Sequence, residues 1–203
     1  MKRRTYYAHP TAVIDRGATI GRGTKVWHFC HIMSGARVGK NCVLGHNVFV
    51  AASVIGDRCR LQNNVSVYEG VELAEEVFVG PSAVFTNVLA PRAFLTVPRE
   101  RYLATRVGRG VTIGANATIV CGVDIGPYSL IGAGAVITRD VPPHALVTGV
   151  PGRQAGWMCR CGRKIVLRDR QNARPKNPIT CSDCGSIYGF VNKTLQLKPA
   201  RQR

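Results

Sequence analysis

IDRGATIGRGTKVWHFCHIMSGARVGKNCVLGHNVFVAASVIGDRCRLQNNVSVYEGVELAEEVFVGPSAVF, residues 14–85, is the stretch that decides the fold. A large apolar side chain returns in it at every sixth position, apart from one residue dropped after Val50. These positions are Ile14, Ile20, Val26, Ile32, Val38, Leu44, Val50, Ile55, Leu61, Val67, Leu73, Val79 and Phe85. Four residues after most of them comes a small or modest side chain. The same period resumes at Ile113, Ile119, Ile125, Ile131 and Ile137.

A period of six matches neither the 3.6-residue period of a helix nor simple alternation along a long strand. Internal repeats of this kind predict a solenoid, in which each coil buries its inner face by stacking on the next. The alternative is a set of unrelated short buried strands, which two phased blocks of matches disfavour. We therefore expect an all-β chain in which residues 18 apart stack about 4.8 Å from each other.

This pattern resembles the hexapeptide-repeat acyltransferases, over roughly residues 9–156. The resemblance implies a left-handed parallel β-helix with three short strands per coil. It also implies a homotrimer whose sites lie between neighbouring subunits. Within the repeat, residues 88–111 lose the period and are rich in arginine, which predicts a long loop insertion beside the site. A loop that serves only subunit contacts is the alternative.

Four cysteines follow the repeat in two pairs, each with a glycine directly after it. They are Cys159, Cys161, Cys181 and Cys184. This spacing predicts a small zinc ribbon at 157–203, in which Zn²⁺ is structural and four thiolates close the site. The alternative is a set of free or redox-active cysteines. The other four cysteines fall singly within the repeat, where a thiol behaves as a small hydrophobe. Both uses favour a reducing, cytoplasmic compartment.

The charge of the chain is strongly basic, at +17 overall. Twelve Lys or Arg against two Asp or Glu lie in residues 153–203, so the expected zinc-ribbon module at 157–203 carries a basic tail. The excess suits anionic substrates such as CoA and nucleotide sugars; binding of nucleic acid or a membrane surface is the less favoured alternative. No apolar run is long enough to span a membrane, and the N-terminus lacks the apolar core of a secretory signal.

The spacing of polar residues suggests where chemistry occurs. Glu69 and Asn87 each come two residues after a repeat position, 18 apart, so they should be neighbours on one face beside the insertion. A carboxylate next to an amide can hold an alkylammonium, orient it and help it to lose a proton. The alternative is a solvated charge and a turn residue.

Several runs resemble one subfamily closely: 26–39, 44–50, 61–71, 79–88, 91–94 and 110–126. It comprises N-acetyltransferases that act on UDP-2-acetamido-3-amino-2,3-dideoxy-glucuronate in surface-polysaccharide (O-antigen-type, lipopolysaccharide) biosynthesis. The resemblance implies that Asn87, after Thr86 in the F-T-N motif, lies near the 3-amino group of the sugar. It places Gln62, Asn63, Pro91 and Arg92 near the nucleotide sugar. Many relatives have Asp where this chain has Glu69.

Histidine is a second candidate for the base, because relatives acting on other amino sugars use one. His28 and His46 are 18 apart and should stack, whereas His31 lies elsewhere. Either a polar ladder or a base with its partner fits this pattern. The three convergent histidines of the zinc-dependent carbonic anhydrases on the same scaffold are not matched.

Acetyl-CoA is expected to run along the groove between coil stacks. Exposed backbone amides beside small residues would hold its pantetheine, and a cation would hold its 3′-phosphate. The candidates are Gly114, Ala115, Gly132, Ala133, Gly134, Arg139 and Arg153. The glycines also serve as coil corners. Gly149 to Arg153 resembles the ending common to acetyl-CoA-dependent members of the family.

The sequence thus predicts acetyl transfer from acetyl-CoA to the 3-amine of a UDP-linked sugar acid. The alternatives are another nucleotide-linked amino sugar, such as a dTDP-3-amino-deoxyhexose, or a non-catalytic trimeric scaffold whose ribbon binds nucleic acid or protein. Deletion of residues 159–203 is expected to leave acetylation intact.

Overall fold

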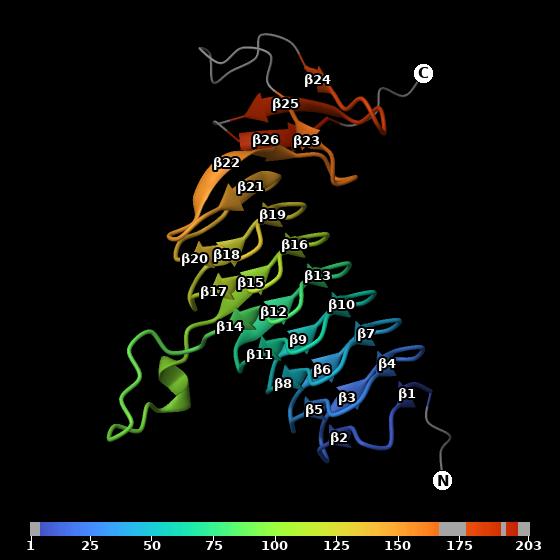
Figure 1. Cartoon of the computed structure of the whole chain (residues 1–203), viewed down its shortest axis with the longest axis vertical. Helices are drawn as coiled ribbons and strands as arrows, with labels where there is room; N and C mark the ends of the chain where they lie inside the picture. Colours follow the sequence, from blue (N-terminus) through green and yellow to red (C-terminus); the bar gives the residue numbers. More distant parts are fainter. Residues whose placement is uncertain (1–4, 167–177, 192–193, 199–203) are drawn as a thin grey trace.

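The computed structural model describes residues 5–166, 178–191 and 194–198, so part of the predicted basic tail lies outside the described residues. The chain winds into a three-sided parallel β-helix, followed by a small module that contains the paired cysteines (Figure 1). The strands of the described chain are two to six residues long. A 3₁₀ turn, η1 (Arg99–Arg101), is the one helical segment in the described ranges, and no helix there could cross a membrane.

Three sheets form the sides of the prism. The first contains β1 (Tyr7–Ala8), β4 (Lys25–Val26), β7 (Val43–Leu44), β10 (Arg60–Leu61), β13 (Phe78–Val79), β16 (Thr112–Ile113), β19 (Leu130–Ile131), β21 (Ala145–Thr148), β22 (Arg153–Met158) and β23 (Lys164–Ile165). The second contains β2 (Val13–Ile14), β5 (His31–Ile32), β8 (Phe49–Val50), β11 (Ser66–Val67), β14 (Val84–Phe85), β17 (Thr118–Ile119) and β20 (Val136–Ile137). The third contains β3 (Thr19–Ile20), β6 (Arg37–Val38), β9 (Val54–Ile55), β12 (Val71–Leu73), β15 (Thr105–Val107) and β18 (Asp124–Ile125).

We call the corner between the first and second sheets the first edge, that between the second and third the second edge, and that between the third and first the third edge. A separate antiparallel sheet of β24 (Ile179–Thr180), β25 (Ile187–Val191) and β26 (Thr194–Leu197) completes the cysteine module.

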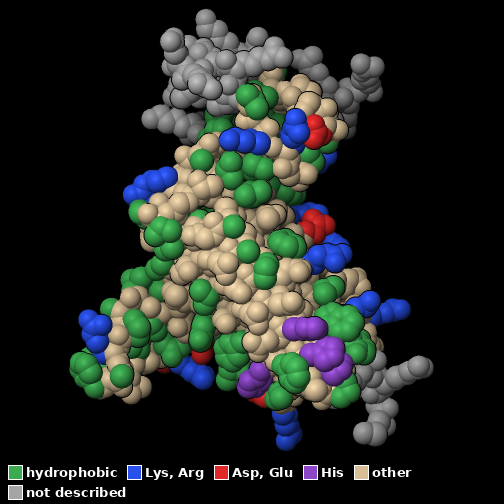
Figure 2. Space-filling model, in the orientation of Figure 1, with side chains coloured by type: hydrophobic (Ala, Val, Ile, Leu, Met, Phe, Trp, Pro, Cys, Tyr) green, Lys and Arg blue, Asp and Glu red, His purple; other side chains and the backbone are tan. Residues whose placement is uncertain are grey.

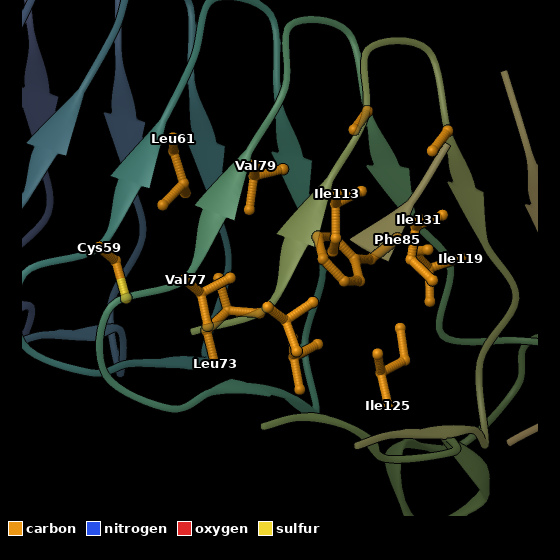
Figure 3. Close-up of a cluster of buried hydrophobic side chains, with 14 of the residues drawn as sticks. Cys59, Leu61, Leu73, Val77, Val79, Phe85, Ile113, Ile119, Ile125 and Ile131 are labelled. Atoms are coloured by element: carbon orange, nitrogen blue, oxygen red, sulfur yellow. The ribbon is translucent and has the colours of Figure 1, made fainter. Parts of the chain in front are cut away.

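The register between coils follows the predicted period. Tyr7 pairs with Lys25, and the spacing shortens by one residue, to Arg37 with Val54, where the sequence drops a residue. From Val26 onward the repeat side chains point inward and are nearly inaccessible, and several of them fill the interior in Figure 3. The single cysteines Cys30, Cys42 and Cys59 occupy the small inward position and are buried. The prediction of an all-β solenoid is confirmed.

The insertion is shorter than the sequence indicated. β15 pairs in parallel with both β12 and β18, so the coil has already resumed at Thr105. The loop that leaves the prism is therefore 88–104 rather than 88–111. Thr105 and Val107 are buried on either side of exposed Arg106. This short strand was not predicted from the sequence because its two inward residues lie within an arginine-rich segment that lacks the six-residue period.

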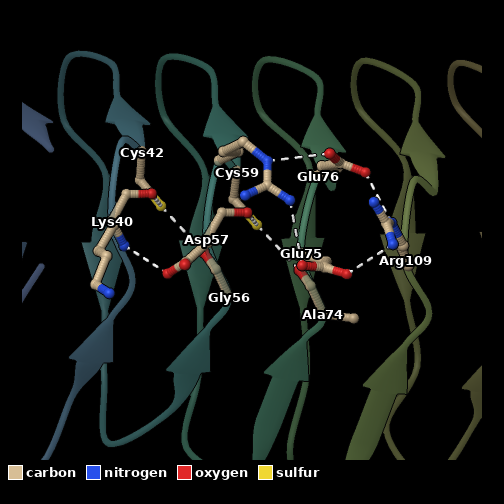
Figure 4. Close-up of polar contacts among 10 residues, drawn as sticks. Lys40, Cys42, Gly56, Asp57, Cys59, Ala74, Glu75, Glu76 and Arg109 are labelled. Atoms are coloured by element: carbon tan, nitrogen blue, oxygen red, sulfur yellow. Dashed lines mark hydrogen bonds and ion pairs between the residues drawn. The ribbon is translucent and has the colours of Figure 1, made fainter. Parts of the chain in front are cut away.

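Ion pairs along the third edge link the coils on both sides of the insertion (Figure 4). Arg109 lies 3.0 Å from Glu75 and 2.8 Å from Glu76, and Arg58 pairs with the same two carboxylates from the preceding coil. Hydrogen bonds from Arg109 and Arg58 lower the pKa of Glu76. The cluster thus helps to align the first coil after the loop.

The end of the prism is not a clean domain boundary. β22 pairs antiparallel with β21, the last rung of the first sheet, and β23 pairs antiparallel with β22. Strand β22 therefore crosses the predicted division between residues 156 and 157.

Candidate active site and metal centre

The second edge brings Glu69 and Asn87 to equivalent positions in consecutive coils. The register that pairs Ser66 with Val84 produces this alignment, as the spacing predicted. Glu69 Oε2 lies 3.6 Å from Arg99 Nε, and the carbonyl of Asn87 accepts a hydrogen bond from the N–H of Leu103. The insertion therefore closes at its base beside Asn87 and contacts Glu69 through Arg99. Arg99 is a neighbour that the sequence did not single out.

The other predicted residues at this edge differ in their surroundings. The hydroxyl of Thr86 accepts a hydrogen bond from the N–H of Cys121 at 3.0 Å, so it joins two coils. Pro91 and Arg92 lie exposed on the loop, where Arg92 forms an isolated bridge with Leu95. Of this group, Arg92 is the residue whose charge is available to a ligand.

A hollow of about 290 Å³ lies along the first edge. Trp27, His46, Gln62 and Asn63 contribute to its lining. The side-chain oxygen of Asn63 accepts a hydrogen bond from the backbone N–H of His46 at 2.9 Å. The side-chain amide of Gln62 is therefore the more available of the two for a ligand. The sequence prediction included both amides but omitted Trp27, because an aromatic residue beside a repeat position has no signature of its own.

A column of imidazoles continues this edge towards the N-terminus, where histidines gather on the face shown in Figure 2. His28 stacks on His9 with ring centroids 3.5 Å apart and meets His46 edge-on at 4.7 Å. The Nδ1 atom of His28 is buried and has no hydrogen-bond partner among the described residues. Burial, followed by the charges of His9 and His46, lowers the pKa of His28. A lowered pKa favours the neutral ring, which is the form that a general base needs.

His31 belongs to neither edge. It lies on the outer face of the second sheet, where its Nε2 is 3.2 Å from Asp15 Oδ1 and its ring meets Phe49 at 5.9 Å. The pair has the composition of an acid–base dyad but is three coils away from Asn87 along the stack.

The glycine steps predicted for CoA lie on the first edge of consecutive coils. A Cβ on Gly114 would come 2.4 Å from the backbone nitrogen of Ala133, so coil stacking alone requires glycine there. Gly134, in contrast, has open space around it and a φ of +68°. Ala133 and Gly134 are exposed and Ala115 is half-buried, so their backbone is within reach of a ligand.

The structure brings the two predicted phosphate-binding arginines together. Arg139 and Arg153 line one hollow of about 280 Å³ with Gly152. The turn that precedes Arg153 is fastened to β20, because Gly152 N–H donates to Val136 O and Val136 N–H donates to Gly149 O. Two guanidinium groups at one hollow suit a phosphate.

A wider groove of about 820 Å³ follows the outer face of the third sheet. Its charged residues pair with one another, since Arg106 lies 3.9 Å from Glu72 and 3.7 Å from Asp124. None of the predicted site residues lines it.

The four cysteines of the module converge as predicted. Their sulfur atoms all lie within 4.8 Å of one another, at 3.4 Å for Cys159 and Cys184 and 3.7 Å for Cys161 and Cys181. Tetrahedral Zn²⁺ with 2.3 Å bonds separates its sulfurs by about 3.8 Å, so the arrangement fits such an ion. Hydrogen bonds with Ser186 lower the pKa of Cys184 to about 6, which favours the ligating thiolate. The cluster could hold a metal ion.

The predicted substrate residues thus divide between two edges of the second sheet. Gln62, Asn63 and His28 lie on the first edge, while Glu69, Asn87 and the insertion lie on the second. One chain does not bring the two groups into one cluster.

A prism of stacked six-residue repeats defines the hexapeptide-repeat fold. The family model described as bacterial transferase hexapeptide (six repeats) matches residues 17–52 and 104–139. The dTDP-3-amino-3,6-dideoxy-alpha-D-galactopyranose 3-N-acetyltransferase of Aneurinibacillus thermoaerophilus is 39% identical over 188 residues, or 93% of each chain. The chain belongs to the hexapeptide-repeat family of acetyl-CoA-dependent sugar N-acetyltransferases.

More distant relatives share the scaffold. A serine acetyltransferase of Mycobacterium tuberculosis is 33% identical over 131 residues, which are 63% of this chain and 48% of that protein. Among solved structures, a mutant of AntD, an N-acyltransferase from Bacillus cereus in complex with dTDP and coenzyme A, superimposes with a TM-score of 0.53. It is 16% identical and the match covers 77% of this chain and 84% of that one, which shows a common fold.

Proposed function

We propose that this chain moves an acetyl group from acetyl-CoA to the 3-amino group of a nucleotide-linked 3-amino sugar. The observation that carries the proposal is the alignment of Glu69 with Asn87 beside the base of the insertion. The 39% identical relative, named as a 3-N-acetyltransferase of a dTDP-linked 3-amino sugar, supports the same class of substrate.

The residues at the second edge suit amide formation. An amine reaches the edge as an ammonium ion, which Glu69 attracts and the side-chain oxygen of Asn87 orients. Loss of one proton, to Glu69 or to water, gives the neutral nucleophile. The nitrogen then forms a bond to the acetyl carbon and loses its second proton while the carbon–sulfur bond breaks, and the CoA sulfur takes up one proton and leaves as a thiol.

The remaining residues bind the two substrates. Gln62 and Trp27 at the first-edge hollow would hold the nucleotide, and Arg139 with Arg153 would hold the phosphates of CoA. The first and second edges lie at opposite ends of the strands of the second sheet, so one chain cannot bring them together. We therefore propose that a homotrimer completes each site from two subunits. The division of the predicted residues between the edges supports this assembly.

Two sugars remain in competition. The motif resemblance favours UDP-2-acetamido-3-amino-2,3-dideoxy-glucuronate, whose carboxylate Arg92 or Arg99 on the insertion could pair with. The relative favours a dTDP-linked 3-amino-dideoxyhexose, which has no carboxylate. The ratio of kcat/KM for the two nucleotide sugars decides between them. If the hexuronate is preferred through Arg92, Arg92→Ala should reduce that preference at least about tenfold, since one charged hydrogen bond contributes about 1.5–3 kcal/mol.

We also propose that the four-cysteine cluster binds a structural Zn²⁺. A closed Cys₄ set leaves no position open for a substrate, so the ion would contribute folding energy rather than catalysis. Metal analysis of the purified chain should find about one zinc per chain, and Cys161→Ser should lower that content, whereas Ser182→Ala should not. A chain without zinc after purification in its presence would contradict the assignment.

The function itself is tested by the release of CoA thiol. The purified chain should release it from acetyl-CoA with a nucleotide-linked 3-amino sugar and not with the matching 3-hydroxy sugar, because the amine is the nucleophile. The product should gain one acetyl group by mass. An absence of release with UDP-, dTDP- and GDP-linked amino sugars alike would reject the proposal.

A further inference from the structure

The first sheet of the prism continues without a break into the cysteine module (Figure 1). β21 is the last rung parallel to the coils, and β22 pairs with it from Ala145 opposite Trp157 to Thr148 opposite Arg153. Cys159 and Cys161 form the turn of the next hairpin, because β22 ends at Met158 and β23 begins at Lys164. The first pair of metal ligands is therefore the turn of a hairpin in the prism's own sheet.

The module also covers the apolar end of the coils. Trp157, Ile165, Tyr188 and Leu195 are all buried and belong to the same hydrophobic cluster as the repeat side chains. An uncovered end would expose the aliphatic interior of the last coil, and solenoids require a capping element there. The module supplies that element.

Tyr188 joins the two halves of the module at its metal ligands. It is fully buried, and its hydroxyl lies 3.1 Å from the sulfur of Cys159 and accepts the N–H of Arg160 at 3.0 Å. The aromatic contact between Trp157 and Phe190, at 5.4 Å, is a further link between β22 and β25. Arg163 also pairs with Asp183 at 3.6 Å across this junction. The four sulfurs lie among these contacts, so a metal ion bound there would strengthen the joint between the small sheet and the prism.

The same contacts reach one end of the β21–β22 hairpin, whose opposite end carries the residues proposed for CoA. The ring of Tyr188 meets His144 at 5.1 Å, and His144 stacks on Tyr128 of the preceding coil at 5.4 Å. His144 Nδ1 lies 3.0 Å from the carbonyl of Met158 at the far end of β22. The turn at 149–152, with Arg153 at its end, is the other end of this hairpin.

We propose that the four-cysteine module is the C-terminal cap of the coils, and that its metal, through Tyr188, holds the β21–β22 hairpin in the arrangement that binds acetyl-CoA. The ligand half of this inference rests on the proposed acetyl transfer and the metal half on the proposed zinc site, whereas the covering of the last coil rests on neither. The inference reverses the expectation that deletion of residues 159–203 leaves acetylation intact, because such a deletion would uncover the last coil.

Hydrogen exchange of the full chain, measured by mass spectrometry with zinc and after chelation, tests the cap directly. Amides in 145–158 should exchange about tenfold faster without the metal, since one charged hydrogen bond contributes about that factor to local opening. Amides in 26–85 should change little. Equal exchange of 145–158 in both samples would overturn the inference, and so would equal acceleration of both regions.

Tyr188→Phe separates the hydroxyl from the metal itself. The variant should keep its zinc, exchange faster in 145–158 and bind CoA at least about fivefold more weakly by calorimetry. The matched control is Tyr7→Phe, which removes an exposed hydroxyl from the first coil and should change neither readout. A zinc-loaded Tyr188→Phe chain with unchanged exchange and affinity would overturn the role of Tyr188.

The two hypotheses fail in different ways. Metal-dependent protection of 145–158 in a chain that binds no CoA would support the cap and reject both its ligand half and the proposed function. Acetyl transfer with equal exchange and CoA affinity in the loaded and metal-free chains would support the function and reject the cap.

Discussion

The first and second edges of the prism flank the same sheet but differ in construction. The first edge runs without interruption and presents stacked rings and amides around the hollow lined by Trp27 and Gln62. The second edge carries Glu69 and Asn87 and is broken by the loop 88–104, which contacts Glu69 through Arg99. The uninterrupted first edge therefore offers a surface for binding, whereas the insertion gives the second edge a loop beside the proposed catalytic residues.

The coil beneath the interruption should dominate stability. Phe85 is fully buried in the last strand before the loop, so Phe85→Ala should lower the free energy of unfolding by about 3–5 kcal/mol. The matched control is Phe94→Ala in the loop, where the ring is 81% exposed and a loss within about 0.5 kcal/mol is expected. Denaturant unfolding measures both values. Similar losses would mean that the loop is an integral part of the core.

The sequence predicted the periodic part of this arrangement well. The 18-residue spacing correctly aligned Glu69 with Asn87 and His28 with His46, because stacked coils convert a period into adjacency. Contacts made by non-periodic segments were beyond it. The pairing of Arg99 with Glu69 depends on how the loop folds back, and Tyr188 reaches Cys159 only through the tertiary packing of the module. The separation of the two edges is implicit in the period, since Gln62 follows Leu61 and Glu69 follows the next repeat position, Val67.

The interrupted edge should control the rate of acetyl transfer. Glu69→Gln should lower kcat by about 100-fold, because the amide neither attracts the ammonium nor takes its proton. Glu72→Gln is the control, since the same change falls on the outer face of the third sheet beside Arg106. Steady-state release of CoA thiol measures both variants. Equal kcat values for Glu69→Gln and the wild-type chain would show that Glu69 does not accept the proton of the ammonium ion and that water does.

The uninterrupted edge should control affinity instead. Gln62→Ala should raise KM for the nucleotide sugar about tenfold and leave kcat nearly unchanged, the pattern of lost uniform binding. Gln196→Ala, at an exposed position of the cysteine module, should change neither constant. A fall in kcat for Gln62→Ala at constant KM would assign this edge to the chemical step and remove the contrast between the edges.

A substitution at the third edge, which carries no proposed site residue, should have the smallest effect, and that effect should be on thermal stability. Because its hydrogen bonds with Arg109 and Arg58 lower the pKa of Glu76, the folded chain binds a proton there less readily than the unfolded chain. That stabilisation is present at neutral pH and is lost as the pH falls through the lowered pKa. Glu76→Gln should reduce Tm at pH 7 by about 1–3 °C, and the reduction should shrink in acid and in high salt. Calorimetric melting at several pH values provides the measurement.

Mixed oligomers test most directly whether the two edges act together across copies of the chain. Gln62→Ala and Glu69→Gln chains would be co-expressed in equal amounts, and kcat/KM of the mixture compared with each parent. If each site takes its two edges from different subunits, about a quarter of the sites combine two intact edges, and activity should reach about a quarter of the wild-type value. A mixture no more active than the average of its parents would contradict a site shared between subunits.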